Sequence, residues 1–391
     1  RGYTVNYISN FTDVDDKIIK AANEAGISTK ELSDKFIAAF MEDTGQLGIK
    51  PATQNPRVIN YMDEIIAFVS TLVDKGFAYV SEGDVYFRVA KSNNYAKLAN
   101  KTLEDLEIGA SGRTDAETER KENPLDFALW KAAKEGEVSW DSPWGPGRPG
   151  WHIECSVMAT EILGDTIDIH GGGADLEFPH HTNEIAQSEA KTGKTFANYW
   201  MHNGFVNVDN EKMSKSLGNF VTVHDMLQTV DGQVLRFFLA TQQYRKPINF
   251  TEKAIHDAEV NLKYLKNTHS LPLTEQVNQA ELQTYLDAFQ EAMDDDFNTA
   301  NGVTVLFDMA KWINSGNYDQ TVKDAFEKML QVFGIVFEEE VLDEDIEKLI
   351  EERQTARANK DFATADRIRD ELAAQGIKLL DTKDGVRWTR D

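Results

Sequence analysis

Apolar residues in the first 220 positions recur with two spacings, one typical of strands and one typical of helices. Short apolar runs at 3–11 and 198–208 predict buried strands, the first of them already under way at the start of the chain. Residues 29–48 and 57–75 instead repeat their apolar side chains with the helical period. Further elements are expected as a hairpin at 78–89, a strand at 166–170, and helices at 151–164 and 179–193. Such alternation predicts an α/β layer architecture.

The spacing changes further along the chain, and the changes predict three regions. Residues from about 76 to 150 are polar and rich in glycine and proline, so we interpret them as an insertion into a sheet domain at 1–220. From 221 to 337 the period is helical, with Ile255, Leu262 and Leu265 on one face. The last region, 338–391, is expected to hold the rest of an acidic linker (337–347), one or two helices, and small strands at 377–380 and 386–388.

Composition narrows the class of protein. A chain of 391 residues with 41% hydrophobic content can bury a core in each of two or three domains. No run approaches the roughly 18 apolar residues of a membrane span and no leader precedes the first predicted strand, so we expect a cytoplasmic protein. The lone Cys155 argues against a disulfide framework. A net charge of -25 disfavours bulk attraction to nucleic acid and confines any RNA contact to local basic patches.

A glycine run follows the strand predicted at 166–170. Residues 170–175 read His-Gly-Gly-Gly-Ala-Asp, which lets the backbone approach a ligand and places Asp175 at the carboxyl edge of the sheet, where open α/β folds bind substrates. A tight turn without any ligand explains the same residues.

Metal chemistry is suggested by the helix predicted to start at Pro179. His180 and Glu184 are four residues apart and so share one helix face, and Cys155 on the preceding helix adds a thiol. Imidazole, carboxylate and thiolate are all ordinary zinc ligands. The alternative is a surface His/Glu pair beside a small buried cysteine.

The loop after the last predicted strand is rich in lysine and serine. Residues 211–219 read Glu-Lys-Met-Ser-Lys-Ser-Leu-Gly-Asn, so Lys212 and Lys215 are placed to embrace a triphosphate and follow its charge as pyrophosphate departs. A short Lys/Ser string is also typical of a solvated loop. The full Lys-Met-Ser-Lys-Ser string, however, resembles the signature of class I aminoacyl-tRNA synthetases, in the position where that class carries it.

Further motifs make the resemblance specific to the cysteinyl-tRNA synthetases, and it spans essentially the whole chain. The matching stretches, in order, are 10–19, 150–156, 170–184, 294–299 and 385–388. The resemblance implies a Rossmann-like class I catalytic domain at 1–220, incomplete at its N-terminus, with a connective insertion. It also implies a stem-contact region and helical bundle at 221–337 and a small anticodon-recognition domain at 338–391.

Site residues follow from the resemblance position by position. Cys155, His180 and Glu184 match the ligands of one Zn²⁺ that binds the substrate thiolate, and zinc's preference for sulfur over a hydroxyl would reject serine without editing. Thr12 and Asp175 match the groups that receive the substrate ammonium, and Trp151 matches a wall of the pocket. For Thr12 and Asp13 a helix N-cap role is also open. Lys215 matches the lysine that contacts ATP, with Lys212 assisting.

The implied reaction is attack of the cysteine carboxylate on the α-phosphate of ATP, supplied with Mg²⁺, followed by transfer of cysteine to tRNA(Cys). We expect a monomer. In the last region, the candidates for RNA contact are Arg353, Arg357, Lys360, Arg367, Arg369, Arg387 and Trp388. The alternative is that these side chains are simply solvated and contact no RNA.

Three departures from the family are visible. The His-Ile-Gly-His ATP motif and a second zinc-binding cysteine are absent, so we expect a missing N-terminal segment and no activity from the chain as written. Thr182 stands where the family commonly has glutamate. Two alternatives are a cysteine ligase paralogue with a small amino-sugar acceptor, which would not need the last region, and an inactive zinc-stabilised RNA-binding fragment, which would not need the lysine loop.

Overall fold

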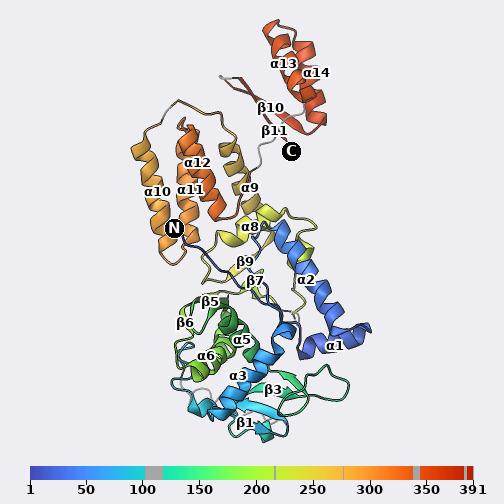
Figure 1. Cartoon of the computed structure of the whole chain (residues 1–391). Helices are drawn as coiled ribbons and strands as arrows, with labels where there is room; N and C mark the ends of the chain where they lie inside the picture. The colour runs from blue at the N-terminus through green and yellow to red at the C-terminus, as the bar shows by residue number, and fades with distance from the viewer. Residues whose placement is uncertain (102–117, 215–216, 276, 338–343, 383–384, 391) are drawn as a thin grey trace. The chain divides into compact units, whose positions relative to one another are not determined.

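The computed structural model describes residues 1–391 except 102–117, 215–216, 276, 338–343, 383–384 and 391 (Figure 1). Two compact units, Arg1–Val336 and Phe337–Asp391, divide the chain. The first holds an α/β part followed by a helical bundle, and the second is a small α/β unit.

A parallel strand pair with two helices forms the centre of the α/β part. Strand β5 (Ile167–Gly173) pairs in parallel with β6 (Ala197–Asn203) in a register that runs from Ile167 opposite Ala197 to Gly173 opposite Asn203. Helix α5 (Trp151–Leu163) precedes β5, and α6 (Thr182–Thr192) connects the two strands (Figure 1). Ile167, Ile185 and Phe196 form the buried cluster between strands and helix. The strand and helices were predicted with nearly these bounds.

Three helical segments near the start of the chain support this centre. They are α1 (Asp16–Ala25), α2 (Thr29–Gln46) and α3 (Met62–Asp74), the last preceded by the 3₁₀ turn η1 (Val58–Tyr61). Ser28 and Glu31 form a capping box that fixes the start of α2. The fully buried side chains of Ile65 and Phe68 on α3 pack in one core with Ile153 of α5, so α3 holds the helix that carries Cys155.

The region interpreted as an insertion contains an antiparallel sheet in the order β1-β2-β3-β4. Its strands are β1 (Ala78–Ser81), β2 (Asp84–Phe87), β3 (Phe127–Ala132) and β4 (Gly147–Pro149), and short 3₁₀ turns lie at η2 (Val89–Lys91) and η3 (Thr118–Arg120). The hairpin of β1 and β2 was predicted, and its turn has positive φ at Glu82 and Gly83, as a tight two-residue connection requires. Strands β3 and β4 were not predicted, because each is short and only tertiary pairing reveals it.

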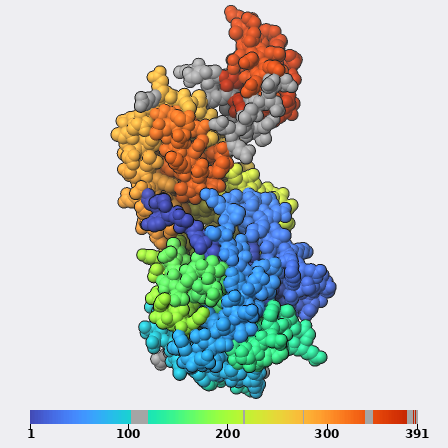
Figure 2. All heavy atoms as spheres, viewed as in Figure 1, coloured from blue at the N-terminus to red at the C-terminus, as the bar shows by residue number. Residues whose placement is uncertain are grey.

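The opening residues do not form the buried strand predicted at 3–11. Tyr3, Val5 and Tyr7 are 85%, 74% and 55% exposed, and the segment joins no named strand: its backbone makes the isolated bridges Ile8 to Gln54 and Phe11 to Arg57. The described chain leaves the side chains of residues 3–7 exposed, whereas residues 8–11 are half-buried. Arg1 instead pairs with Asp294 of the helical bundle, 2.5 Å away, and the opening residues lie on the surface as a dark blue patch beside the bundle (Figure 2).

The strand predicted at 198–208 is broken into two. After β6 the chain turns at Gly204, whose N–H donates to the carbonyl of Tyr244 at 2.7 Å. Strand β7 (Val206–Val208) then pairs antiparallel with β8 (Glu211–Lys212) and parallel with β9 (Ile248–Phe250). The sequence interpretation missed β9, because a three-residue strand inside a long helical period leaves no alternating pattern to recognise.

Helices then continue to the end of the first unit, as predicted. They are α7 (Val223–Met226), α8 (Gly232–Ala240), α9 (Glu252–His269), α10 (Gln279–Asp294), α11 (Thr299–Asn314) and α12 (Gln320–Val332). Leu262 and Leu265 are buried, as their predicted face requires. Among the described helices, none has the length and apolar character to cross a membrane.

The motif at 294–299 connects the bundle to the segment that follows α8. Asp296 and Phe297 both adopt positive φ between α10 and α11. This turn aims the Asp296 carboxylate at Tyr244, whose hydroxyl donates at 2.8 Å, and at Arg245, whose Nε donates at 2.5 Å. Because the segment of Tyr244 also bonds Gly204, the motif links the bundle to the chain between β6 and β7.

The second unit packs two helices on a hairpin. Helices α13 (Glu344–Ala358) and α14 (Phe362–Ala374) precede β10 (Ile377–Thr382) and β11 (Gly385–Arg390), the two predicted strands, which pair antiparallel. Ile346, Ile368 and Ile377 form its buried core. The acidic linker predicted at 337–347 is too long, since α13 already begins at Glu344; residues 338–343 of it lie outside the described residues.

Gly204→Ala is expected to lower the free energy of unfolding by about 1–3 kcal/mol, because overpacked side chains displace their surroundings. A Cβ at this position would lie 2.4 Å from the carbonyl carbon and oxygen of Lys246, which are backbone atoms and cannot rotate away. Urea denaturation measures the effect. Gly45→Ala in α2 is the matched control, since a Cβ there meets nothing within 4 Å. Equal destabilisation by both changes would contradict the proposed packing at Gly204.

Candidate metal centre and active site

Three side chains of different types converge where α5, β5 and α6 meet. Cys155 comes from the second turn of α5, His180 from the π turn η5 (Glu177–His181), and Glu184 from the first turn of α6. One donor atom from each lies within 4.8 Å of the other two. The Nε2 of His180 is 3.1 Å from the Oε1 of Glu184. The structure therefore brings together the three residues predicted as metal ligands.

The local backbone differs from the predicted single helix starting at Pro179. Phe178 has extended φ and ψ angles of -140° and 129°, and α6 begins only at Thr182. Because the π turn runs directly into α6, His180 and Glu184 still face each other. Thr182, which departs from the family pattern, is buried and donates its hydroxyl to the Glu177 carbonyl at 2.8 Å, so it stabilises this junction.

The Glu184 carboxylate is buried without a hydrogen bond. Its exposure is 0%, and both of its oxygens lack a hydrogen-bond partner. The Nε2 atom of His170 lies 3.0 Å from Oε2 of Glu184, and the Nε2 atom of His180 lies 3.1 Å from Oε1. Neither contact has the alignment that a hydrogen bond needs. Burial acts to raise the pKa of Glu184, but the positive charge available on His170 and His180 outweighs it and lowers that pKa below its usual range. An ionised, unsatisfied carboxylate here fits a bound cation.

The pKa of Cys155, unlike that of Glu184, is shifted toward the neutral form when no cation is present. Burial, followed by the charges of Glu184 and Glu154, raises the pKa of the Cys155 thiol well above its usual value. Asn10 provides the compensating contact, because its Nδ2 donates a hydrogen bond to Sγ at 3.8 Å. A divalent cation beside Sγ would favour the thiolate and reverse the effect of burial.

A second set of potential ligands shares Glu184 with the first. His170, His181 and Glu184 also place one donor atom each within 4.8 Å of one another. His181 is buried, which lowers its pKa to about 3, and its Nδ1 shares a hydrogen bond with His202 Nε2 at 2.7 Å. Neither His170 nor His181 was assigned as a ligand from the sequence. The adjacent histidines and the histidine before the glycine run were the available signal.

His152 and Trp151 flank His180 on the α5 side. The Nδ1 atoms of His152 and His180 lie 2.9 Å apart, which leaves the Nε2 of His180 directed toward Glu184. Burial, with a contribution from His180, lowers the pKa of His152 to about 3. The Trp151 ring lies 4.2 Å from the His180 ring and is 47% exposed, so it covers one side of the cluster and faces solvent on the other.

The segment that carries Thr12 docks onto α5 beside Cys155. The Thr12 hydroxyl donates to Glu154 Oε2 at 3.4 Å. The helix N-cap role considered for Thr12 and Asp13 is wrong: Asp15 caps α1 by accepting from the Ile18 N–H at 2.7 Å. Asp13 is instead buried and accepts from Arg57 Nε at 2.8 Å, which fixes the segment to the turn before α3.

Asp175 lies at the end of β5, in the exposed 3₁₀ turn η4 (Ala174–Leu176). The glycines before it are needed for close packing. A Cβ at Gly173 would lie 2.5 Å from Asp175 Oδ1, and one at Gly172 would lie 2.9 Å from the His181 ring. The run therefore lets the turn and the histidine cluster approach β5. The role of Asp175 in binding the substrate ammonium stays a prediction.

The lysine loop is only partly described. Lys212 is exposed on β8, with its Nζ 4.2 Å from the centre of the Phe205 ring. Lys215, the other predicted lysine, lies outside the described residues. Asn219 folds the loop back, because it accepts from the Ser214 N–H at 2.9 Å and donates to the Lys212 carbonyl at 3.3 Å. The sequence interpretation had assigned Asn219 no role.

The predicted RNA-contacting residues of the second unit have mixed surroundings. Arg353 is only 5% exposed and Trp388 packs against the hydrophobic core, so both stabilise the unit. Arg367 pairs with Glu371 at 3.2 Å, in an exposed position. For Arg353 and Trp388 these positions weigh against direct phosphate contact or base stacking.

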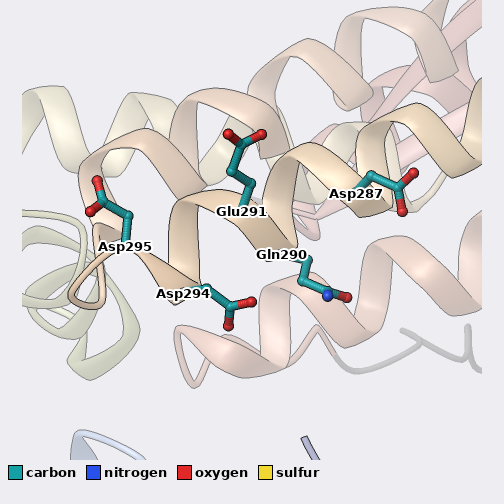
Figure 3. Close-up of a pocket in the computed structure, with 5 residues that line it drawn as sticks. All are labelled: Asp287, Gln290, Glu291, Asp294 and Asp295. Atoms are coloured by element: carbon teal, nitrogen blue, oxygen red, sulfur yellow. The ribbon is translucent and has the colours of Figure 1, made fainter.

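Acidic side chains gather along α10, far along the chain from the predicted site. Four acidic residues, Asp287, Glu291 and Asp294 of the helix and Asp295 directly after it, lie there together with the neutral Gln290 (Figure 3). Asp294 accepts from Arg1, and no imidazole or thiol lies among these five. This surface carries excess negative charge and would repel a phosphate backbone.

Solved structures with a similar fold are class I aminoacyl-tRNA synthetases of other specificities. Methionyl-tRNA synthetase of Mycobacterium tuberculosis matches with a TM-score of 0.60 and 15% identity, over 85% of this chain and 81% of that chain. A putative arginyl-tRNA synthetase from Campylobacter jejuni matches with a TM-score of 0.52 and 15% identity, over 80% and 70%. The fold is therefore that of a class I synthetase.

Sequence comparison gives the particular family. Residues 1–260 match the class I (C) tRNA synthetase catalytic domain, 288–338 the DALR domain, and 339–388 the cysteinyl-tRNA ligase anticodon binding domain. A cysteine–tRNA ligase of Streptococcus thermophilus is 95% identical over all of this chain and 88% of its own length. One of Streptococcus pyogenes is 83% identical over all of this chain and 87% of its own length. The chain belongs to the cysteine–tRNA ligase family.

Asp13→Asn is expected to lower the free energy of unfolding by about 1–3 kcal/mol, because it leaves part of the Arg57 charge unpaired. The Asp13 side chain is 1% exposed. Asp34 pairs with the same arginine at 2.6 Å but is 41% exposed, so Asp34→Asn is the matched control and should cost clearly less than Asp13→Asn. Urea unfolding of both variants makes the comparison, and a control that costs as much as Asp13→Asn would sink this interpretation.

Proposed function

We propose that this chain serves the ATP-dependent activation of L-cysteine to cysteinyl adenylate and its transfer to tRNA(Cys). The observation that carries the proposal is the convergence of Cys155, His180 and Glu184 around a buried carboxylate with no hydrogen bond, in a member of the cysteine–tRNA ligase family. Thiolate, imidazole and carboxylate together are a donor set that suits zinc.

One zinc ion held by these three residues would supply a Lewis acid that prefers a thiolate to an alcohol, and so select cysteine over serine. Cys155 favours this set over the set of His170, His181 and Glu184, because only the first contains sulfur. His152 holds Nδ1 of His180 and thereby keeps Nε2 available for the metal.

The residues around the centre are suited to the rest of the amino acid. Thr12 and Asp175 are proposed to accept hydrogen bonds from the substrate ammonium, and the exposed face of Trp151 to exclude water from it. A carboxylate oxygen of cysteine attacks the α-phosphorus of ATP. The bond between the α-phosphorus and the oxygen that bridges it to the β-phosphate breaks, and pyrophosphate leaves. Lys212 and Lys215 are proposed to neutralise the departing pyrophosphate, with Mg²⁺ entering on ATP.

In the second step a ribose hydroxyl of the tRNA attacks the carbonyl carbon of the adenylate and AMP leaves. The match of 339–388 to an anticodon binding domain supports a tRNA acceptor over a small amino sugar. The exposed Lys212 and the match of 1–260 to a catalytic domain support an enzyme over an inactive RNA-binding fragment. We propose a monomer, since one chain supplies every residue invoked.

Zinc content tests the proposed ligands. Elemental analysis of the purified chain is expected to find about one zinc per chain, as a single three-ligand site allows. Cys155→Ser should abolish most of it, because a hydroxyl is a poor zinc ligand. His170→Ala is the matched control and should keep the metal. Loss of zinc in the control with retention in Cys155→Ser would assign the metal to the histidine set instead.

Substrate selection gives a further prediction. Calorimetric titration of the zinc-loaded chain should detect binding of L-cysteine and no binding of L-serine at the same concentrations, because the metal discriminates sulfur from oxygen. Asp175→Asn should weaken cysteine binding about tenfold by loss of one charge-assisted hydrogen bond. Equal affinity for the two amino acids would contradict the proposed selection.

Amino-acid activation can be measured separately from substrate binding. Cysteine-dependent exchange of pyrophosphate into ATP, measured on this chain, tests it directly. Because the two binding tests above do not need ATP, their outcomes can be interpreted whichever way the exchange assay falls.

A further inference from the structure

The side chain of Asn10 reaches the sulfur of Cys155 from a segment that is 145 residues away in the sequence. Its Nδ2 lies 3.8 Å from Sγ, a hydrogen-bond distance for the large sulfur atom. Asn10 was part of a matching motif but had no assigned role. The contact is partly buried, so water competes with it less than it would at the surface.

The backbone on both sides of Asn10 is fixed. The N–H of Ser9 donates to the Gln54 carbonyl at 3.2 Å, and the N–H of Phe11 donates to the Pro56 carbonyl at 2.9 Å. Asn55 adds a side-chain bond, from its Nδ2 to the Ser9 carbonyl at 2.6 Å. Two residues further on, the buried Asp13 is held by Arg57. The amide of Asn10 is therefore presented to Sγ by an anchored segment.

The surroundings of Sγ make a donor there consequential. Glu184, the neighbouring ligand, is 0% exposed, and an ionised carboxylate accepts hydrogen bonds but cannot donate them. An N–H that donates to a thiolate draws electron density from the sulfur lone pairs, which then donate less to a bound metal. A metal that receives less charge from Cys155 remains a stronger acceptor for a second sulfur.

We propose that Asn10 is a positioning residue for the metal-bound thiolate, whose amide donates to Cys155 Sγ and limits the charge that this sulfur gives to the metal. The inference rests on the proposed zinc site at Cys155, His180 and Glu184. It assigns to the segment at 9–13 an electronic role, besides the binding of substrate proposed for Thr12.

Cobalt(II) in place of zinc gives a direct test, because a thiolate bound to Co²⁺ produces a sulfur-to-metal charge-transfer absorption band. In Asn10→Ala and Asn10→Asp the band should move to longer wavelength, since the sulfur lone pairs rise in energy without the donor. Competition with a chelator should show zinc affinity reduced by about tenfold, because the sulfur loses the partner that orients it, and this loss outweighs its greater donor strength. Asn10→Asp keeps the side-chain size and replaces the donor with a charged acceptor, whereas Asn10→Ala removes the donor without adding charge.

Asn55→Ala is the matched control. It removes an amide from the same neighbourhood and one bond to Ser9, while both backbone bonds around Asn10 remain. Its band and zinc affinity should equal those of the unaltered chain. An unmoved band in both Asn10 variants, or the same displacement in Asn55→Ala, would overturn the inference. Absence of any sulfur-to-cobalt band in the unaltered chain would instead overturn the proposed metal site itself.

Discussion

A buried carboxylate without a hydrogen bond is the constraint around which the catalytic part of this protein is organised. Removing an ionised Glu184 from water costs several kcal/mol unless a positive partner compensates. Within the described residues, the nearest groups are the imidazoles of His170 and His180, whose nitrogens lie 3.0 and 3.1 Å from its oxygens without making a hydrogen bond. A cation shared with Cys155 and His180 would satisfy the carboxylate, and this requirement connects the three elements that contribute ligands.

The remaining structure holds those elements in place. Helix α3 packs its fully buried face on α5, the glycine run lets the turn of Asp175 and the ring of His181 approach β5, and the Asp13–Arg57 pair anchors the segment that reaches Cys155. The linkage from Asp296 through Tyr244 to Gly204 extends this support to the helical bundle. Positions far apart in the chain thus share one small region of the first unit.

Sequence reasoning predicted the parts of this arrangement that depend on local pattern. The helices α2, α3, α5 and α6, the hairpin at Glu82 and Gly83, and the helical bundle all have periodic or turn-forming residues that predict them. Grouping Cys155 with His180 and Glu184 rested on ligand chemistry and on their match to a family, because spacing alone relates only the last two.

The failures have a common cause, which is dependence on tertiary partners. Residues 3–11 have the composition of a buried strand, yet Tyr3 and Val5 are exposed because the described chain offers them no cover. Strands β3 and β9 exist through pairing that leaves no periodic signal. Asp15 caps α1, whereas Thr12 contacts Glu154 and Asp13 pairs with Arg57. Asn10 contacts Cys155, which is 145 residues away in the sequence. The contact of His170 with Glu184 depends on the orientation of the imidazole ring. Residue spacing reveals neither contact.

X-ray absorption at the zinc edge, recorded on the zinc-loaded chain without and with L-cysteine, tests the central claim most directly. The account predicts one sulfur at about 2.3 Å together with nitrogen and oxygen ligands, and a second sulfur when cysteine is added. A zinc shell of nitrogen and oxygen alone, unchanged by cysteine, would contradict the assignment of Cys155 as a ligand and the selection of cysteine by metal–thiolate binding.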